Sequence, residues 1–186
     1  MKPLHSNSLL LAWRVAEAEA KRLNAPEIEP IHLLIGLAKV VDLDLPPLLS
    51  KNLADRDEIL EEFLREVRRL RTVFRTAQVD PAALRRALRG KPMHQRFSVP
   101  EAETLHRSAD ARKTFADADH FAQLADSPVY PVHLLYAVLL HEDDGIKAAC
   151  ANLSIDRKRF QEVASREVIW RDEKTPHGNK PKTRWN

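Results

Sequence analysis

The chain has 186 residues, and 30 lysine and arginine residues against 27 aspartate and glutamate residues give it a formal net charge of +3. This length suits one domain or at most two, and it is enough to enclose a hydrophobic core. No apolar run reaches the roughly 20 residues of a membrane span, and the first residues lack a signal-peptide cleavage site. A single cysteine, Cys150, excludes an intramolecular disulfide and a cysteine-based zinc site, so we expect a cytoplasmic protein.

Apolar residues recur at three- and four-residue steps along most of the chain, which predicts amphipathic helices. Asp80 and Pro81 supply a cap and a first helical residue, and Ser98 to Glu101 has the spacing of a capping box. No alternating run of β-branched residues predicts a strand, so the fold class is all-α. The tail, 171–186, contains two prolines and a glycine and is expected to be flexible. The helices are predicted, in chain order, at 8–24, 30–41, 57–77, 82–89, 98–116, 131–140, a short segment ending near 152, and 156–170.

The chain repeats a motif. Glu29–Leu34 returns 101 residues later as Tyr130–Leu135, and Val79–Leu88 pairs with Ile155–Ala164 at an offset of 76 residues. The offsets differ by 25, which predicts a helical insertion of that size between residues 42 and 68 of the first copy. A rival alignment pairs Asn52-Leu53 with Asn152-Leu153 and places the insertion further downstream. The matched positions of the repeat include Pro30, His32, Leu33, Leu34, Asp80, Pro131, His133, Leu134, Leu135 and Asp156.

At these residues the sequence resembles the Clp N-terminal domain, or Clp repeat domain, of the AAA+ unfoldases that feed Clp proteases or disaggregate proteins. Each half of that domain has a long helix, a His-Leu-Leu motif opening an apolar helix, a short helix and a last helix. The resemblance covers residues 6–170. It implies two pseudo-symmetric four-helix repeats, 6–90 and 98–170, packed as one globule. It also implies binding of substrates or adaptor proteins, with no chemistry in the domain itself.

Two features depart from that family. Clp N-terminal domains that recognise phosphorylated arginine have a glutamate directly before the motif histidine, where this chain has Ile31 and Val132. We therefore do not expect that activity. The insertion is the second departure, and it falls in the half that would carry the family's usual interaction surface.

The sequence offers no nucleotide-binding loop. Gly90-Lys91 is followed by Pro92, and Arg85 stands five residues earlier, where the phosphate-binding motif requires glycine. The chain is therefore either an accessory that acts alone or a fragment of a longer motor.

The other residues with chemical potential have structural interpretations. His32 and His133 occupy first turns of apolar helices, where packing and local hydrogen bonds explain them better than catalysis. The run from His141 to Asp144 is best read as a solvated helix end, and Cys150 as a small core residue. We expect no cofactor, no metal and no enzymatic activity.

Positive charge is concentrated in one stretch. Residues 65–96 have a net charge of +8, whereas 1–64 and 97–170 have −4 each and the tail, 171–186, has +3. The arginines of that stretch form either a solvated, internally paired helix face, a surface for protein docking, or a phosphate-binding face. The candidate partner-binding residues are Arg68, Arg71, Arg75, Arg85, Arg86 and Arg89.

The leading hypothesis is a non-enzymatic protein-binding module whose groove between the two halves accepts an apolar peptide or an adaptor helix. Its expected partners are Clp ATPase or protease subunits, adaptors and unfolded clients. The alternative is a helical nucleic-acid-binding or regulatory protein that uses the arginine-rich stretch and the tail.

Overall fold

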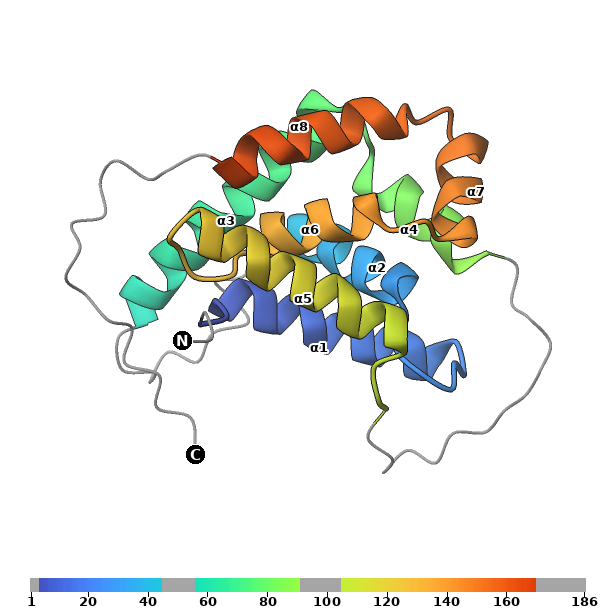
Figure 1. Cartoon of the computed structure of the whole chain (residues 1–186), viewed down its shortest axis with the longest axis horizontal. Helices are drawn as coiled ribbons and strands as arrows, with labels where there is room; N and C mark the ends of the chain where they lie inside the picture. The colour runs from blue at the N-terminus through green and yellow to red at the C-terminus, as the bar shows by residue number, and fades with distance from the viewer. Residues whose placement is uncertain (1–3, 45–55, 91–104, 170–186) are drawn as a thin grey trace.

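A computed structural model describes residues 4–44, 56–90 and 105–169, and this part of the chain is all-helical, as predicted (Figure 1). The only β-type pairs in it are two isolated bridges. The helices are α1 (Asn7–Arg22), α2 (Pro30–Val41), α3 (Arg56–Thr76), α4 (Pro81–Arg89), α5 (Ala109–Leu124), α6 (Pro131–Leu140), α7 (Asp144–Asn152) and α8 (Arg157–Ile169).

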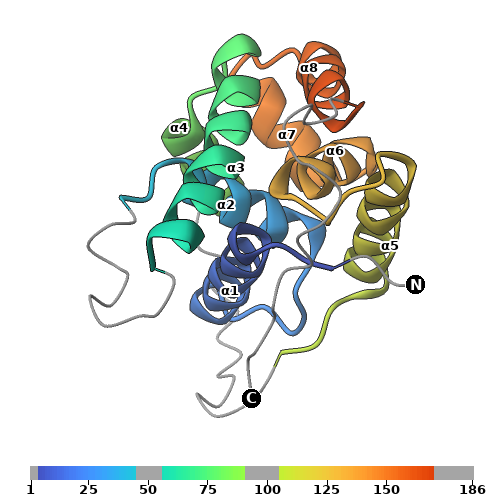
Figure 2. The same ribbon diagram turned by 90° about the vertical axis from the view of Figure 1, so that its left-hand side faces the viewer.

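The two most apolar helices, α2 and α6, lie at the centre of the molecule (Figures 1 and 2). Helix α2 packs against α1 and α4, and α6 packs in the same way against α5 and α8. Contacts between the halves include the central pair α2 and α6, α3 with both α6 and α8, and α4 with α7. Because each buried leucine or valine contributes about 1.5–3 kcal/mol, these central helices supply much of the hydrophobic stabilisation.

The two histidine motifs have the same local geometry. Each helix has proline at its first position, and the histidine Nδ1 atom accepts a hydrogen bond from the backbone N–H of the N-cap residue. The donor is Glu29 for His32, at 3.0 Å, and Tyr130 for His133, at 2.9 Å. Burial lowers the pKa of each imidazole to about 4, so both are neutral at pH 7. The histidines therefore close the first turns of α2 and α6.

In each half, the loop before the central helix pairs with the segment that precedes the first helix of the other half. Ile28, between α1 and α2, accepts a hydrogen bond from the backbone of Ser108 and donates one to that of His106. Val129, between α5 and α6, does the same with Ser6 and Leu4. Ser6 and Ser108 also cap α1 and α5 with their hydroxyl groups. These reciprocal contacts tie the halves together through short extended segments.

The predicted helix at 98–116 is wrong in its position. Helix α5 begins at Ala109, and residues 105–108 are not helical because their backbone groups pair with Ile28. The helix then continues to Leu124, since Ala118 and Ala122 extend its buried face beyond the predicted end. The predicted capping box at 98–101 and the tail, 171–186, lie outside the described residues.

The long helix predicted at 57–77 is confirmed as α3, which has 21 residues, whereas α7 at the corresponding place in the second half has nine. Both helices are followed by a residue with positive φ, 58° at Gln78 and 54° at Ser154. These two residues keep the offset of 76. This spacing is the one expected if the additional residues of the first half precede the C-terminal end of α3.

Candidate protein-binding site

The six candidate arginines divide into two sets, and the first set binds to groups of the protein itself. Arg71 donates from Nε to the carbonyl oxygen of Val41, at 2.8 Å. Arg85 donates to the carbonyl oxygen of Ala38 and to the carboxylate of Asp42, each at 2.6 Å. Both side chains thus satisfy acceptors at the C-terminal end of α2, where the last carbonyl groups have no partner within the helix.

The second set consists of Arg68, Arg75 and Arg86, whose residues are exposed. Within the described part of the chain their guanidinium groups make no hydrogen bond or ion pair. The predicted arginines are thus not one uniform surface, because half of them stabilise the fold and the others remain available. Arg89, the sixth, belongs to the first set through an ion pair with Glu19.

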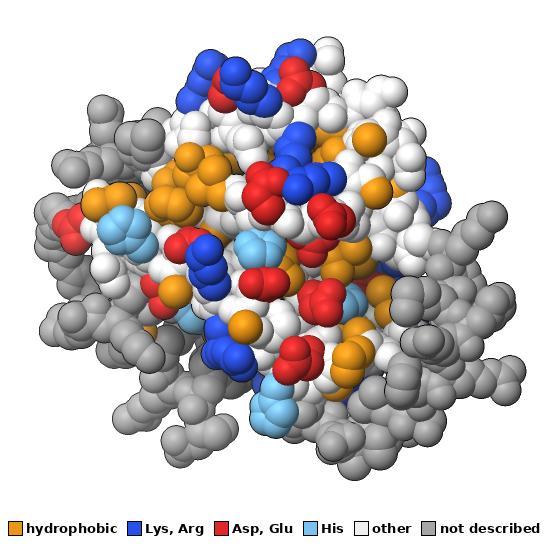
Figure 3. Space-filling view, turned by 45° about the vertical axis from the view of Figure 1, so that its right-hand side comes forward, with side chains coloured by type: hydrophobic (Ala, Val, Ile, Leu, Met, Phe, Trp, Pro, Cys, Tyr) orange, Lys and Arg blue, Asp and Glu red, His pale blue; other side chains and the backbone are white. Residues whose placement is uncertain are grey.

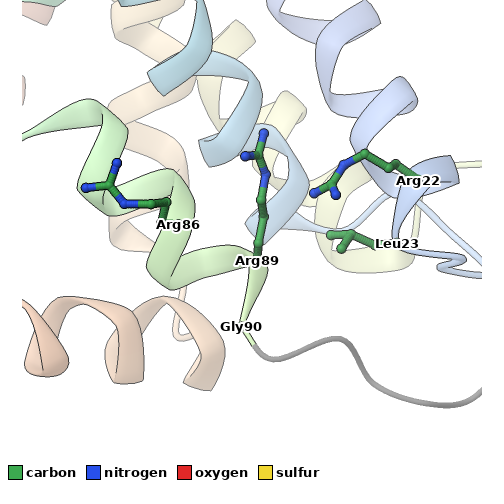
Figure 4. Close-up of a pocket in the computed structure, with 5 residues that line it drawn as sticks. All are labelled: Arg22, Leu23, Arg86, Arg89 and Gly90. Carbon is green, nitrogen blue, oxygen red and sulfur yellow. The ribbon is translucent and has the colours of Figure 1, made fainter.

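A hollow of about 290 Å³ lies between the C-terminal ends of α1 and α4 (Figure 4). Figure 4 shows Arg89 and Arg22 extending from the two helices towards the same space, with Arg86 one turn earlier on α4. Sequence reasoning named the two α4 arginines but missed the α1 side, because residues so far apart in the sequence meet only through the packing of both helices on α2. The residues lining the hollow are Arg22, Leu23, Arg86, Arg89 and Gly90.

Glu19 is the acidic group of this region. Arg89 binds its carboxylate through two nitrogens, at 2.6 and 3.1 Å, and Arg22 binds the Oε2 atom at 3.0 Å. Burial alone would raise the pKa of Glu19, but the hydrogen bonds from Arg89 and Arg22 outweigh it and hold the pKa below its ordinary value. One ionised carboxylate therefore binds two guanidinium groups, and Arg86 adds a third positive charge to the lining, which leaves the hollow positively charged.

Aromatic rings form the contact between α1 of the first half and α5 of the second. Trp13 and Phe115 meet edge to face with ring centroids 5.6 Å apart, and the Arg107 guanidinium covers both rings. His5 and Asp119 flank them, with 3.1 Å between Nε2 and Oδ1. The hollow between α1 and α4 does not lie at this contact.

A second hollow of about 210 Å³ lies between α5 and the end of α6. Its lining combines both charge signs with the half-exposed Leu140. The face in Figure 3 likewise shows basic, acidic and hydrophobic side chains intermixed, without a continuous basic track. The lining residues are Lys113, Asp117, Leu140, His141 and Glu142.

A buried carboxyl group joins α3 to the start of α1. Ser6 and Ser8 donate hydrogen bonds to the Oε2 atom of Glu66, whereas its Oε1 atom has no partner in the described structure. Burial raises the pKa of Glu66 to about 7 against the effect of the two serines. A sequence pattern does not reveal this buried group, because a glutamate on an amphipathic helix is ordinarily solvated.

Within residues 4–44, 56–90 and 105–169, no cluster of three or more His, Cys, Asp or Glu side chains could hold a metal ion. None of the helices in these ranges is long and apolar enough to cross a membrane. Cys150 is buried, and burial raises the pKa of its thiol.

Solved structures show where this arrangement of helices occurs. The Hsp104 N-terminal domain of Candida albicans is similar with a TM-score of 0.59 at 17% identity, over 90% of this chain and 94% of that one. The protein has the fold of a Clp N-terminal domain. The N-terminal domain of the caseinolytic-protease-associated chaperone ClpD of Arabidopsis thaliana gives a TM-score of 0.53 at 15% identity, over 88% of this chain and 94% of that one.

A structure from a malarial protein secretion system is also similar to this chain, with a TM-score of 0.56 at 17% identity. It covers 88% of this chain and 94% of that chain. No family model matches the chain, and no curated protein matches it. The fold is therefore shared over 88–90% of the chain, although only 15–17% of the residues are identical.

Proposed function

We propose that the protein is a non-enzymatic module that binds other proteins in a Clp-type chaperone or protease system. It engages substrates or adaptors of a Clp unfoldase, or it binds the Clp machine and modulates it. The observation that carries this proposal is the Clp N-terminal fold over about nine tenths of the chain. The two chaperone structures named above are isolated N-terminal domains, and this sequence lacks the phosphate-binding loop.

The proposal treats the chain as two related units, 6–90 and 98–170, followed by the tail. Several described contacts support this division, because they recur at the sequence offsets. Arg85 donates to the carbonyl of Ala38, and Gln161 donates to that of Leu139, its counterpart 101 residues later. Arg85 and Gln161 make equivalent hydrogen bonds and lie 76 residues apart in the sequence. This spacing favours the alignment that places the insertion before the end of α3.

The exposed side chains also suit a protein partner. Arg68 and Arg75 present positive charge on α3, while Leu4 and Leu10 expose 46% and 41% of their surface near the start of α1. Interfaces between proteins combine such arginines with apolar groups. The expected partners are Clp ATPase or protease subunits, adaptors and unfolded clients of the cytoplasm.

Binding to two purified partners tests the function. The full chain, immobilised on a biosensor, is exposed to the host's Clp ATPase and, separately, to a permanently unfolded casein. The rate of casein degradation by the Clp ATPase and its protease is then measured with and without the protein. We expect saturable binding to at least one partner and a change in the degradation rate of about twofold or more.

A titration with nucleic acid distinguishes the proposed protein binding from the alternative function, which is nucleic-acid binding. Phosphate-driven binding to labelled DNA or RNA falls steeply between about 50 and 200 mM salt, because condensed counterions are released on binding. The proposal is wrong if the protein binds neither protein partner, leaves degradation unchanged and binds nucleic acid with this salt dependence.

A further inference from the structure

We propose that the hollow between the C-terminal ends of α1 and α4 is a docking site for an acidic segment of a protein partner. The site consists of Arg22, Arg86 and Arg89 with Leu23 and Gly90 between them. The inference rests on the proposed function and gives it a location and a ligand chemistry, namely the carboxylate groups of aspartate and glutamate side chains.

The charge balance provides the first argument. Glu19 neutralises part of the charge of Arg22 and Arg89, and Arg86 has no acidic partner in the described part of the chain. Guanidinium groups bind carboxylates through two parallel, charge-assisted hydrogen bonds. Arg22 is half-exposed but also pairs with Glu19, and Figure 4 shows the Arg86 guanidinium pointing away from Arg22. The exposed Arg86 is therefore the group that can bind an incoming carboxylate without breaking an ion pair, and Arg22 adds positive charge at the same hollow.

Shape provides the second argument. The hollow of about 290 Å³ has room for roughly ten water molecules, or for one acidic side chain with some of its hydration. The described residues leave the edge open at Gly90, since a Cβ atom there would have none of them within 4 Å. The chain of a partner can approach the α4 end closely at this point, and Leu23 offers an apolar contact for the methylene groups of an acidic side chain.

The second half of the molecule shows that a basic residue at the end of α1 is not required by the architecture, although α8, the counterpart of α4, has Arg166 in its last turn. Basic residues in the last turn of a helix commonly compensate its dipole, which would explain them without any ligand. Helix α5, which corresponds to α1, has no basic residue in its last turn. The compensation is thus dispensable at the equivalent helix end. When α1 and α5 are aligned on their N-caps, Ser6 and Ser108, Glu19 and Arg22 correspond to Phe121 and Leu124. At the offset of 76, Arg86 and Arg89 correspond to Glu162 and Ser165.

A carboxylate fits this site better than a nucleic acid. Single strands are bound by grooves in which aromatic rings stack on the bases, and no aromatic residue lines the hollow. The ionised Glu19 would also repel a doubly charged phosphate more strongly than a singly charged carboxylate. We therefore assign the site to an acidic segment of a protein.

The test uses the full chain and a short fluorescent peptide of glutamate and leucine residues, with the glutamine version of that peptide as its control. Fluorescence anisotropy gives the dissociation constant for wild type, Arg86→Glu and Arg75→Glu. The latter makes the same charge change on an exposed arginine of α3 outside the hollow. We expect Arg86→Glu to weaken binding by about tenfold or more and Arg75→Glu by less than about twofold.

Each other result overturns the inference. Equal weakening by both variants would mean non-specific attraction, and tight binding of the glutamine peptide would exclude carboxylate recognition. Stronger competition by an oligonucleotide than by the acidic peptide would reassign the site to phosphates. Because both exchanged residues are exposed, circular dichroism of each variant should match wild type.

Failure of this inference can be distinguished from failure of the proposed function. If wild type binds the Clp ATPase or the unfolded casein but not the acidic peptide, the docking site is wrong and the function stands. If wild type binds the acidic peptide but neither protein partner, the site stands and the assignment to a Clp system is wrong.

Discussion

The two halves of the molecule agree where α2 and α6 begin and differ where α1, α4, α5 and α8 end. At both beginnings, a proline and a buried neutral histidine close the first turn. At the ends, the first half has a basic hollow, whereas Leu124 of the second half is 67% exposed. Helix starts buried in the core must satisfy their N–H groups, so their solution recurs. Exposed ends carry no such constraint, and they are where the halves can acquire different partners.

The largest difference in stability is expected at Gly36 and its counterpart Ala137. A Cβ atom on Gly36 would lie 2.3 Å from the carbonyl oxygen of Ala12, so α1 and α2 must separate to admit it. We expect Gly36→Ala to lower the free energy of unfolding by about 3 kcal/mol and Ala137→Gly by about 1 kcal/mol, measured by urea denaturation. A loss below about 0.5 kcal/mol for Gly36→Ala would mean that α1 and α2 do not approach each other this closely.

Glu66 and Glu142, which are related by the offset of 76, should differ in their pH dependence. The folded-state pKa of Glu66 is raised to about 7 by burial, so its carboxyl stabilises the fold when protonated, and this contribution is lost as the pH rises from about 4.5 to 7. Relative to wild type, Glu66→Gln should therefore gain about 2 kcal/mol between pH 5 and pH 8.

The matched control is Glu142→Gln. Glu142 is exposed, and its hydrogen bond with Lys147 lowers its pKa, so its contribution has the opposite pH dependence. Chemical denaturation of both variants at several pH values measures the effect. Parallel curves for Glu66→Gln and wild type would show that this carboxyl is not perturbed.

Arg85 and Gln161 should differ moderately, although both bind the C-terminal end of the preceding apolar helix. Arg85 binds Ala38 and Asp42, whereas the Leu139 carbonyl bound by Gln161 keeps a second donor in Arg157. We expect Arg85→Ala to cost about 1.5 kcal/mol and Gln161→Ala about 0.5 kcal/mol in thermal or urea unfolding. Equal costs would remove the proposed difference between the two helix ends.

The smallest effects are expected at the residues with positive φ after α1 and α3. Gln78 has φ of 58° and Asn24 has φ of 53°. Glycine adopts this conformation without strain, and asparagine tolerates it better than glutamine. Gln78→Gly should raise the free energy of unfolding by about 0.5–1 kcal/mol, and Asn24→Gly by less. Destabilisation by Gln78→Gly would show that its side chain contributes contacts that outweigh the strain.

The sequence predicted what short segments decide by themselves. Pro30 and Pro131 open helices as expected, and Asp80 caps α4 through its side chain. The helix predicted at 98–116 is misplaced because the pairing of Ile28 with residues 106 and 108 is a contact between the halves, which a local pattern does not contain. The sequence likewise does not reveal the burial of Glu66 or the position of Arg22 beside α4, because both depend on contacts between helices.

The arginine-rich stretch shows the limit of reading charge from a sequence. Its residues recur at helical spacing, which predicts a common face, yet Arg71 turns to Val41 and Arg68 does not. Long side chains reach acceptors on neighbouring helices, so the partner of each arginine depends on tertiary packing rather than on its spacing.

Amide chemical shifts of the isotope-labelled protein, recorded during titration with a permanently unfolded client protein, test the central claim of protein binding most directly. We expect the amide shifts to change with client concentration until they saturate. The changes at the ends of α1 and α4 should be larger when the client is rich in acidic residues. An unchanged spectrum at saturating client and Clp ATPase, with shifts appearing on addition of nucleic acid, would contradict it.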